Sequence, residues 1–190
     1  MDANNRDSIL LKCRDIALEC FGTGYIFEQR ANKLRGQIRF LTFLGIVIPI
    51  LIGAIVLNLG KTAVSQPILY IAGIFGIIQI IGSTWSLTSG WDDAYSYSIE
   101  SMNSNHRLSR NYLRLADSPP SEQSELQMQF DLLNQEDQFR SAEDYKQGVS
   151  EKEKRMGMCA GLRIFKRSCA GCGMTPTSMK ASSCSVCGQF

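Results

Sequence analysis

Four cysteines near the end of the chain have the spacing of a metal site. Two Cys-x-x-Cys pairs, Cys169/Cys172 and Cys184/Cys187, are separated by eleven residues. Zinc takes four ligands at tetrahedral corners, and each Cys-x-x-Cys turn supplies two of them. Because four thiolates fill every position and leave none for water, the spacing predicts a structural zinc ion rather than a catalytic one.

A glycine follows each pair, at Gly173 and Gly188. A residue without Cβ lets the backbone turn tightly, so that amides approach the sulfurs. Two other uses of the cysteines stay open. A redox pair expects a strand–helix–strand setting, which the flanking sequence does not show. An iron–sulfur cluster also takes four cysteines, although this symmetrical spacing is closer to a zinc ribbon.

The segment before the first pair is basic. Arg163–Ser168 places three basic residues around Ile164 and Phe165. We interpret this segment as the solvated first strand of the ribbon. A contact with nucleic acid or anionic lipid head groups is the weaker alternative, because three charges are few.

Two long apolar runs lie in the middle of the chain. Phe40–Leu57 has eighteen residues and Ile68–Leu87 has twenty, and Lys61 is the only charged residue between Phe40 and Trp91. Helices of this length match the hydrocarbon core of a bilayer, about 30 Å thick. A cleaved signal peptide is disfavoured for the first run, because thirty-nine residues precede it. The runs predict a membrane hairpin.

Basic residues set the expected orientation of this hairpin. Four of them precede the first span, and Lys61 stands alone in the connection Asn58–Pro67; the four are Arg30, Lys33, Arg35 and Arg39. Positive charge stays on the cytoplasmic side, so both termini are expected there. In a reducing compartment thiolate ligands are favoured over disulfides. Cys13, Cys20 and Cys159 fit no comparable motif, and the first two follow a core-facing helical stripe.

The patterns predict a mainly α fold. The expected parts are cytoplasmic N-terminal amphipathic helices over 1–36, a transmembrane hairpin over 37–88, cytoplasmic helices over 89–147, a linker over 148–162 and a zinc ribbon over 163–190. Gly22–Gly24 is expected to interrupt the first helical segment.

The cytoplasmic helices after the spans carry local signals. Ser89 and Gly90 mark a break, and Ser118-Pro119-Pro120 ends the next helix. Ser124 and Gln127 form a candidate capping box for the helix after it. An apolar stripe is expected to be covered by the N-terminal helices or by another subunit; it consists of Tyr95, Ile99, Met102, His106 and Leu113. On this stripe His106 is interpreted as a packing residue.

The spans contain small and kink-forming residues instead of charges. Faces of small residues let membrane helices approach closely, and a proline can bend its helix. These residues are expected to pack the hairpin against itself or, in the more specific interpretation, against other hairpins, because one hairpin of two helices cannot enclose a pore. They are Gly45, Pro49, Gly53, Ala72, Gly76, Gln79 and Ser83. Intramembrane charge, which transport paths usually carry, is missing from both runs.

The overall composition excludes little else. Twenty Lys and Arg nearly balance eighteen Asp and Glu, so nothing global favours a nucleic-acid partner. With one histidine, no nucleophile motif, no phosphate loop and a filled metal site, we expect no enzyme.

Two parts of the chain together resemble a known family. The amphipathic segment Phe27–Pro49, the two spans and the helix starting at Trp91 resemble bacterial SLATT-type two-transmembrane domains. The cysteine tail is similar to that of the mobile-element-associated CxxCx(11)CxxC proteins, at Cys169, Cys172, Cys184 and Cys187. The resemblance implies a bacterial inner-membrane effector of anti-phage or mobile-element conflict systems. Copies of it are expected to assemble through the cytoplasmic helices and to form a pore or disrupt the bilayer.

The same resemblance implies a separately encoded sensor or trigger protein, because SLATT domains often act with a nucleotide-signal sensor. The zinc ribbon would then dock a partner or gate assembly. An adaptor remains the alternative function. In that case the spans only anchor a zinc ribbon, which tethers a protein or nucleic-acid complex to the membrane without a pore.

Overall fold

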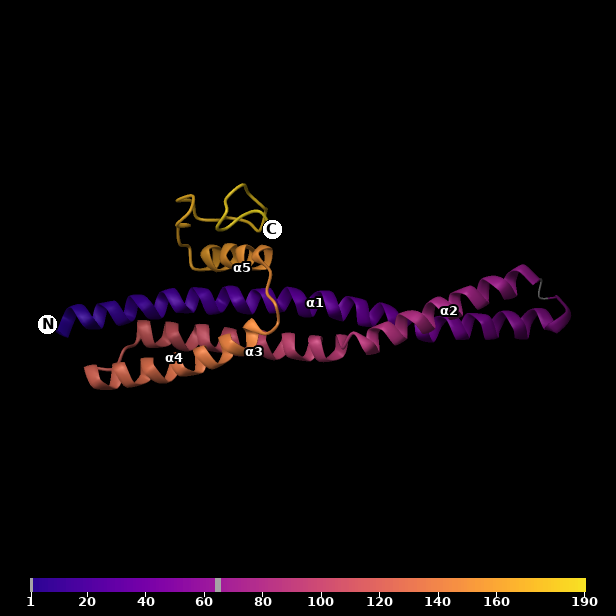
Figure 1. Cartoon of the computed structure of the whole chain (residues 1–190), viewed down its shortest axis with the longest axis horizontal. Helices are drawn as coiled ribbons and strands as arrows, with labels where there is room; N and C mark the ends of the chain where they lie inside the picture. The colour runs from indigo at the N-terminus through magenta and orange to yellow at the C-terminus, as the bar shows by residue number, and fades with distance from the viewer. Residues whose placement is uncertain (1, 64–65) are drawn as a thin grey trace. The chain divides into compact units, whose positions relative to one another are not determined.

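The chain is mainly helical. The computed structural model describes residues 2–63 and 66–190, and side chains at 5–54, 70–86 and 88–190. Five helices run through this part of the chain: α1 (Asp2–Ala63), α2 (Gln66–Thr88), α3 (Trp91–Asp117), α4 (Gln123–Tyr145) and α5 (Glu151–Ile164) (Figure 1). No strand is formed among these residues. The prediction of a mainly α fold is therefore confirmed, whereas the strands expected in a zinc ribbon are absent from the described residues.

The helices form two compact units. The first, which we call the helical unit, contains the residues up to Gln29 together with Ser98–Phe190. The second, the hairpin unit, contains Arg30–Tyr97. Since α1 and α3 each have residues in both units, the expected boundaries at 36 and 89 do not coincide with the division in the structure.

The core of the helical unit joins α1, α3 and α4. Leu108 and Tyr112 of α3 and Leu126 of α4 are fully buried against one face of α1. That face includes Cys13 and Cys20, so their interpretation as core residues is confirmed. The Ser109 hydroxyl donates to the Ala17 carbonyl at 2.7 Å. Figure 1 shows these three helices side by side over the first half of α1.

The expected break at Gly22–Gly24 is wrong, because α1 continues through both glycines. Glycine in a helix interior costs about 1 kcal/mol relative to alanine. Close packing accounts for its use at these positions. A Cβ at Gly22 would lie 2.8 Å from the Gly157 carbonyl oxygen, and one at Gly24 would lie 2.9 Å from the His106 ring. His106 also stacks on Phe21 at 5.1 Å between ring centroids, which confirms it as a packing residue.

The buried face of α3 differs from the expected stripe. Tyr95, Ile99, Met102, His106 and Leu113 are all only partly buried. Polar residues lie deeper, with Ser98, Ser101, Asn105 and Ser109 at 3% exposure or less. A pattern of apolar residues misses this face, because its hydroxyls and amide are satisfied by groups elsewhere in the unit.

Asp144 of α4 is the centre of a buried polar network. It accepts from the Ser101 hydroxyl and the Asn105 amide, each at 2.7 Å, and from the Arg140 guanidinium at 2.8 Å. Arg140 also pairs with Glu100 at 3.1 Å. Since Asp144 and Arg140 are both more than nine-tenths buried, this paired and hydrogen-bonded network fixes α4 against α3.

Of three predictions about helix ends, two are confirmed and one is wrong. The break at Ser89–Gly90 and the end of α3 at Asp117, before the two prolines, are confirmed. The capping box at Ser124 and Gln127 is wrong, because the N-cap of α4 is Glu122, two residues before Ser124, and it has no side-chain cap.

The expected linker over 148–162 is mostly the helix α5. A capping box begins it, in which Ser150 accepts from the Glu153 amide and the Glu153 carboxylate accepts from the Ser150 amide. The run of charges in this segment therefore forms the exposed first turn of a helix rather than a solvated linker. The expected strand over 163–168 is likewise wrong, since α5 extends to Ile164 and a turn follows.

In the hairpin unit α1 and α2 leave most of their apolar side chains uncovered. Phe40, Ile50, Ile80 and Trp85 are each more than 60% exposed. α1 runs to Ala63 and α2 starts at Gln66, so the expected ten-residue connection is largely helical. The Lys61 side chain, residues 64 and 65 and the outer ends of both expected spans lie outside the described side chains.

Candidate metal centre

The four predicted cysteines come together. Their sulfur atoms all lie within 4.8 Å of one another. The Sγ atoms of Cys169 and Cys184 are 3.9 Å apart, and those of Cys172 and Cys187 are 3.8 Å apart. A tetrahedral zinc ion with bonds of about 2.3 Å holds its sulfurs about 3.8 Å apart. The four cysteines therefore could bind a metal ion, and zinc fits their spacing.

Backbone amides point at one sulfur of each pair. The Gly171 amide donates to Cys169 Sγ at 3.3 Å, and the Val186 amide donates to Cys184 Sγ at 3.4 Å. The two turns have the same construction, since in each the first cysteine accepts from the amide two residues later. These amides stabilise negative charge on the sulfurs, which is the form that binds a metal.

The two glycines after the pairs act in different ways. Gly173 has a φ of +71°, in the left-handed region that favours glycine, and its amide donates to the Cys169 carbonyl at 2.8 Å. Gly188 instead gives room, because a Cβ there would lie 2.3 Å from the Ser182 hydroxyl oxygen. Neither amide donates to a sulfur, so the expected reason for these glycines holds only in part.

The thiols of the second pair differ in acidity. Amides of Cys187 and Val186 lower the pKa of the Cys184 thiol to about 6. Burial raises the pKa of the Cys187 thiol. A bound cation would remove this difference, because coordination favours the thiolate at every ligand. The chemistry of the donor set is thus that of a thiolate metal centre.

The metal centre is packed on the helical unit. Cys169 and Cys187 are buried in a cluster with Leu18 of α1 and with Cys159 and Leu162 of α5. Phe190 packs against the same cluster. Sequence reasoning gave Cys159 no role, and no spacing rule would have placed it there, since it comes from the helix that was expected to be a linker.

Further contacts attach the turn between α5 and the first cysteine. Arg167 forms an ion pair with Asp15 of α1. Phe165 packs edge-on against Phe21 at 5.9 Å between ring centroids. α5 itself crosses α1 very closely, because a Cβ at Gly157 would lie 2.6 Å from the Gly22 carbonyl oxygen. The basic segment Arg163–Ser168 is therefore used in part to bind the protein's own first helix.

The predicted membrane residues differ in what surrounds them. At Gly45 a Cβ would meet the Gln79 amide at 3.2 Å, so these two residues face each other across the hairpin. Gly53 and Gly76 have no neighbour among the described residues within 4 Å of such a Cβ. Of the remaining predicted residues, Pro49 and Ser83 are exposed and Ala72 lines an apolar groove between α1 and α2. Gly82, which the small-residue pattern did not include, approaches Leu41 at 3.4 Å.

Proline does not end the first span, since α1 continues through Pro49. By length and composition, the described residues contain one helix that could cross a membrane, within Asn5–Ala54. A second is added if the bent pair Tyr70–Ser86 and Trp91–Asp117 is one span. The most apolar stretch of the first helix is not buried by the rest of the protein, unlike the core helix of a soluble domain.

A helical protein with one or two helices apolar enough to span a membrane, and with a four-cysteine centre, is the class that these features define. The chain belongs to the mobilome CxxCx(11)CxxC protein family, whose model matches residues 11–190. The cysteine formula of this family is the spacing of the metal centre described above. No curated protein and no solved structure matches the chain.

Proposed function

We propose that this protein is a non-enzymatic effector of the bacterial inner membrane that acts in conflicts involving mobile elements. Its hairpins assemble with those of other copies to form a pore or to disrupt the bilayer. Its cysteine centre holds a structural zinc ion. Both termini lie in the cytoplasm, and a separately encoded protein supplies the trigger.

The uncovered apolar surface of the hairpin unit is the observation that carries this proposal. Side chains such as Phe43, Ile46 and Ile81 are more than half exposed, and α1 extends this surface without a break. Leaving so much apolar area in water is unfavourable by about 25 cal/mol per Å². A bilayer, or other hairpins within it, removes that cost.

The family supports the setting of the proposal. Its description places it in the mobilome, and the two-span arrangement resembles SLATT-type effectors. Gly53 and Gly76 support assembly between hairpins, because no described side chain lies within 4 Å of a Cβ at either position. Small residues at such positions let the helices of separate hairpins approach closely.

The metal centre supports a role in control rather than in catalysis. Four thiolates fill a tetrahedral zinc site and leave no position for a substrate. Because the centre packs on Leu18 of α1, and α1 continues into the hairpin unit, a partner that binds the cysteine turns binds a part of the protein that is attached to the helix with the first apolar run. Docking of a trigger protein or gating of assembly follows from that connection.

Membrane potential in bacteria that express the protein tests the proposal. A potential-sensitive dye should report depolarisation by the wild type in the presence of its neighbouring genes. Gly76→Ile should reduce it strongly, because isoleucine would fill the space that another hairpin occupies while meeting nothing in its own chain.

Gly82→Ile is the comparison variant, since a Cβ at this position would already contact Leu41 at 3.4 Å inside the hairpin, so the variant reports on packing within the hairpin alone. A wild-type protein that never depolarises cells would rule out the effector role. Retention of the biological function by Gly76→Ile would favour the adaptor, in which the spans serve only as an anchor.

A further inference from the structure

α4 has a second apolar face that its own chain leaves uncovered. One side of the helix packs into the helical unit through Leu126 and the buried Arg140 and Asp144. The opposite side exposes Met128, Leu132 and Phe139 by 57%, 59% and 73%. Together with the exposed Gln135 and Ala142, these residues recur at intervals of four, three, four and three. We call these five residues the α4 heptad face.

This spacing is that of a coiled-coil seam, in which two helices bury the residues at positions a and d. Leu132 and Phe139 take the a positions, and Met128, Gln135 and Ala142 take the d positions. A single polar residue in such a seam specifies register at some cost in stability. Gln135, at the middle of the face, fits that use.

We propose that the α4 heptad face pairs, in parallel and in register, with the same face of a second copy of this chain. The proposal rests on the proposed function in one respect: copies inserted in one bilayer share an orientation, so their α4 helices run in the same direction. It adds the surface through which the copies recognise each other outside the membrane.

Two of the acidic residues beside the heptad face are paired within the chain. Glu136 is already paired with Arg107 at 2.8 Å, and Glu143 with Lys146 at 2.6 Å. The flanks are therefore close to neutral and favour neither a strongly basic nor a strongly acidic partner. In a parallel pair Asp131 of one copy would face Glu136 of the other, where the guanidinium of the adjacent Arg107 offsets the repulsion.

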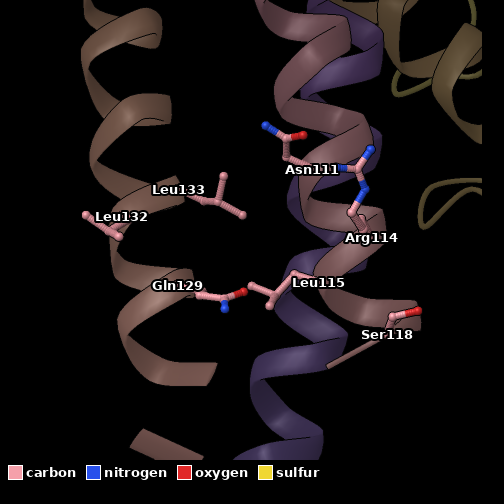
Figure 2. Close-up of a pocket in the computed structure, with 7 residues that line it drawn as sticks. All are labelled: Asn111, Arg114, Leu115, Ser118, Gln129, Leu132 and Leu133. Atoms are coloured by element: carbon pink, nitrogen blue, oxygen red, sulfur yellow. The ribbon is translucent and has the colours of Figure 1, made fainter. Parts of the chain in front are cut away.

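A groove next to the heptad face widens the contact. It has a volume of about 400 Å³ and lies between α3 and α4, with Leu115, Leu132 and Leu133 as apolar lining and Arg114 and Gln129 as polar lining. Figure 2 shows Leu133 turned toward α3, whereas Leu132 points away from it onto the outer side of α4. In knobs-into-holes packing the second copy's Met128 would sit over Gln129 and Leu132, at the edge of this groove.

The faces inside the helical unit cannot serve the same purpose. We expected the stripe on α3 to be covered by the N-terminal helices or by another subunit, and the cytoplasmic helices to hold the copies together. The buried faces of α1, α3 and α4 instead cover one another within one chain. The C-terminal residue Phe190 is also packed, in the cluster of the metal centre. Among the described residues of this unit, α4 offers the heptad-spaced apolar face that remains.

The heptad face is short, about two heptads, and helices of this length associate weakly in solution. Tethering both copies to one membrane compensates, because a linked binding surface experiences an effective concentration in the mM range. The pair is thus expected to form in membranes and to dissociate readily when the protein is diluted in detergent.

Disulfide trapping in bacterial membranes tests the pairing. Leu132→Cys and Phe139→Cys are made separately in the full chain, and the membranes are treated with a mild oxidant. A parallel pair in register should give disulfide-linked homodimers with each single variant, at several times the yield of Ser141→Cys. Ser141 is exposed on α4 but lies off the heptad face. The unmodified chain gives the background from its own seven cysteines.

Equal yields from all three variants would overturn the proposal, and so would yields no higher than the background. Disulfides that form only when the Leu132→Cys and Phe139→Cys chains are mixed would show an antiparallel pair and also contradict it. Adding Phe139→Ser to the Leu132→Cys chain should lower the yield on the order of tenfold, the effect of about 1.4 kcal/mol.

The outcomes separate this proposal from the proposed function. Zinc content serves as a folding control for each variant. It should stay at the wild-type level in a folded chain, because the substituted side chains are exposed and distant from the cysteines in sequence. Disulfides at both positions in cells that never depolarise would leave the α4 pair standing and remove the pore. Depolarisation that depends on Gly76, without disulfides above background, would do the reverse.

Discussion

Glycines are used in opposite ways in the two units. In the helical unit Gly22 and Gly157 lie where two helix backbones cross, and a Cβ at either would come within 3 Å of the other's carbonyl oxygen. In the hairpin unit no described residue lies within 4 Å of a Cβ at Gly53 or Gly76. The difference teaches that the helical unit achieves its close packing between its own helices, whereas the hairpin unit leaves these two small residues uncovered by its described side chains.

Polar groups show the same contrast. The helical unit buries an arginine and an aspartate, and satisfies them through Ser101, Asn105 and Glu100. The hairpin unit contains a groove lined wholly by apolar residues such as Leu44, Ile48 and Phe75. Buried charges that are paired and hydrogen-bonded do not carry the cost of an unsatisfied polar group. An apolar surface of the hairpin's kind is more favourable in a bilayer than in water. Each prediction below tests this difference.

Removal of the metal is expected to have the largest effect, and to affect only the helical unit. Cys184→Ser combined with Cys187→Ser deletes two of the four ligands, and metal binding by such peptides is worth on the order of 10 kcal/mol. Zinc analysis should show loss of the metal. Hydrogen exchange should increase in the cysteine turns and in α5, which share a buried cluster with them.

The backbone amides in the apolar segments of the hairpin unit should exchange as slowly as in the wild type. The Cys13→Ala variant is a suitable control, because Cys13 is a buried thiol of α1 outside the metal centre. A wild-type protein that carries no metal, yet protects the cysteine turns from exchange, would contradict the assignment of the centre.

Breaking the buried polar network should come next. Arg140→Ala leaves the Asp144 carboxylate in the interior without its guanidinium partner, which typically costs about 3–5 kcal/mol. Arg14→Ala removes an ion pair with Asp117 whose side chains are 56% and 64% exposed, and should cost at most about 1 kcal/mol. Urea denaturation of the protein in detergent, followed by circular dichroism, measures both. Equal losses would mean that Asp144 finds other partners when Arg140 is absent.

Glycine substitutions test the difference in packing between the two units directly. Gly22→Ala should destabilise the helical unit by about 1–3 kcal/mol, because two backbones must separate to admit the methyl group. Gly53→Ala should be neutral or stabilising by up to about 1 kcal/mol, since alanine is the better helix former and its Cβ would meet none of the described residues. Thermal denaturation in detergent compares them. A loss at Gly53 as large as that at Gly22 would show that the hairpin is packed more closely than its contacts indicate.

Local signals predicted much of this structure. The cysteine formula located the metal centre because four ligands and two turns lie within nineteen residues. Composition predicted the apolar runs, and Pro119 predicted the end of α3. In each case the residues that decide the outcome are neighbours in the sequence.

The predictions that failed depend on residues far apart. Gly22 continues a helix because it meets Gly157, and α3 buries serines because Asp144 lies in another helix. The linker prediction failed for a nearer reason. The charged residues after Ser150 suggested a solvated segment, but its capping box and the small residues Gly157 and Gly161, which pack on α1, mark a helix.

The smallest expected effect concerns Asp137, a carboxylate at the edge of the helical core that accepts from the Cys20 thiol at 3.3 Å. Burial raises the pKa of Asp137, while the hydrogen bond from Cys20 lowers it. Because the folded chain then binds this proton more tightly than the unfolded chain, its contribution to stability is present at low pH and is lost as the pH rises through the folded pKa.

Asp137→Asn keeps the shape and an acceptor for Cys20 but removes the buried charge. The variant should therefore be slightly more stable than the wild type near neutral pH, and the difference between them should shrink as the pH falls. Urea midpoints measured over a pH series, with the exposed Asp7→Asn as control, would show this convergence, and a variant less stable than the wild type near neutral pH would mean that the ionised carboxylate has a partner that stabilises it.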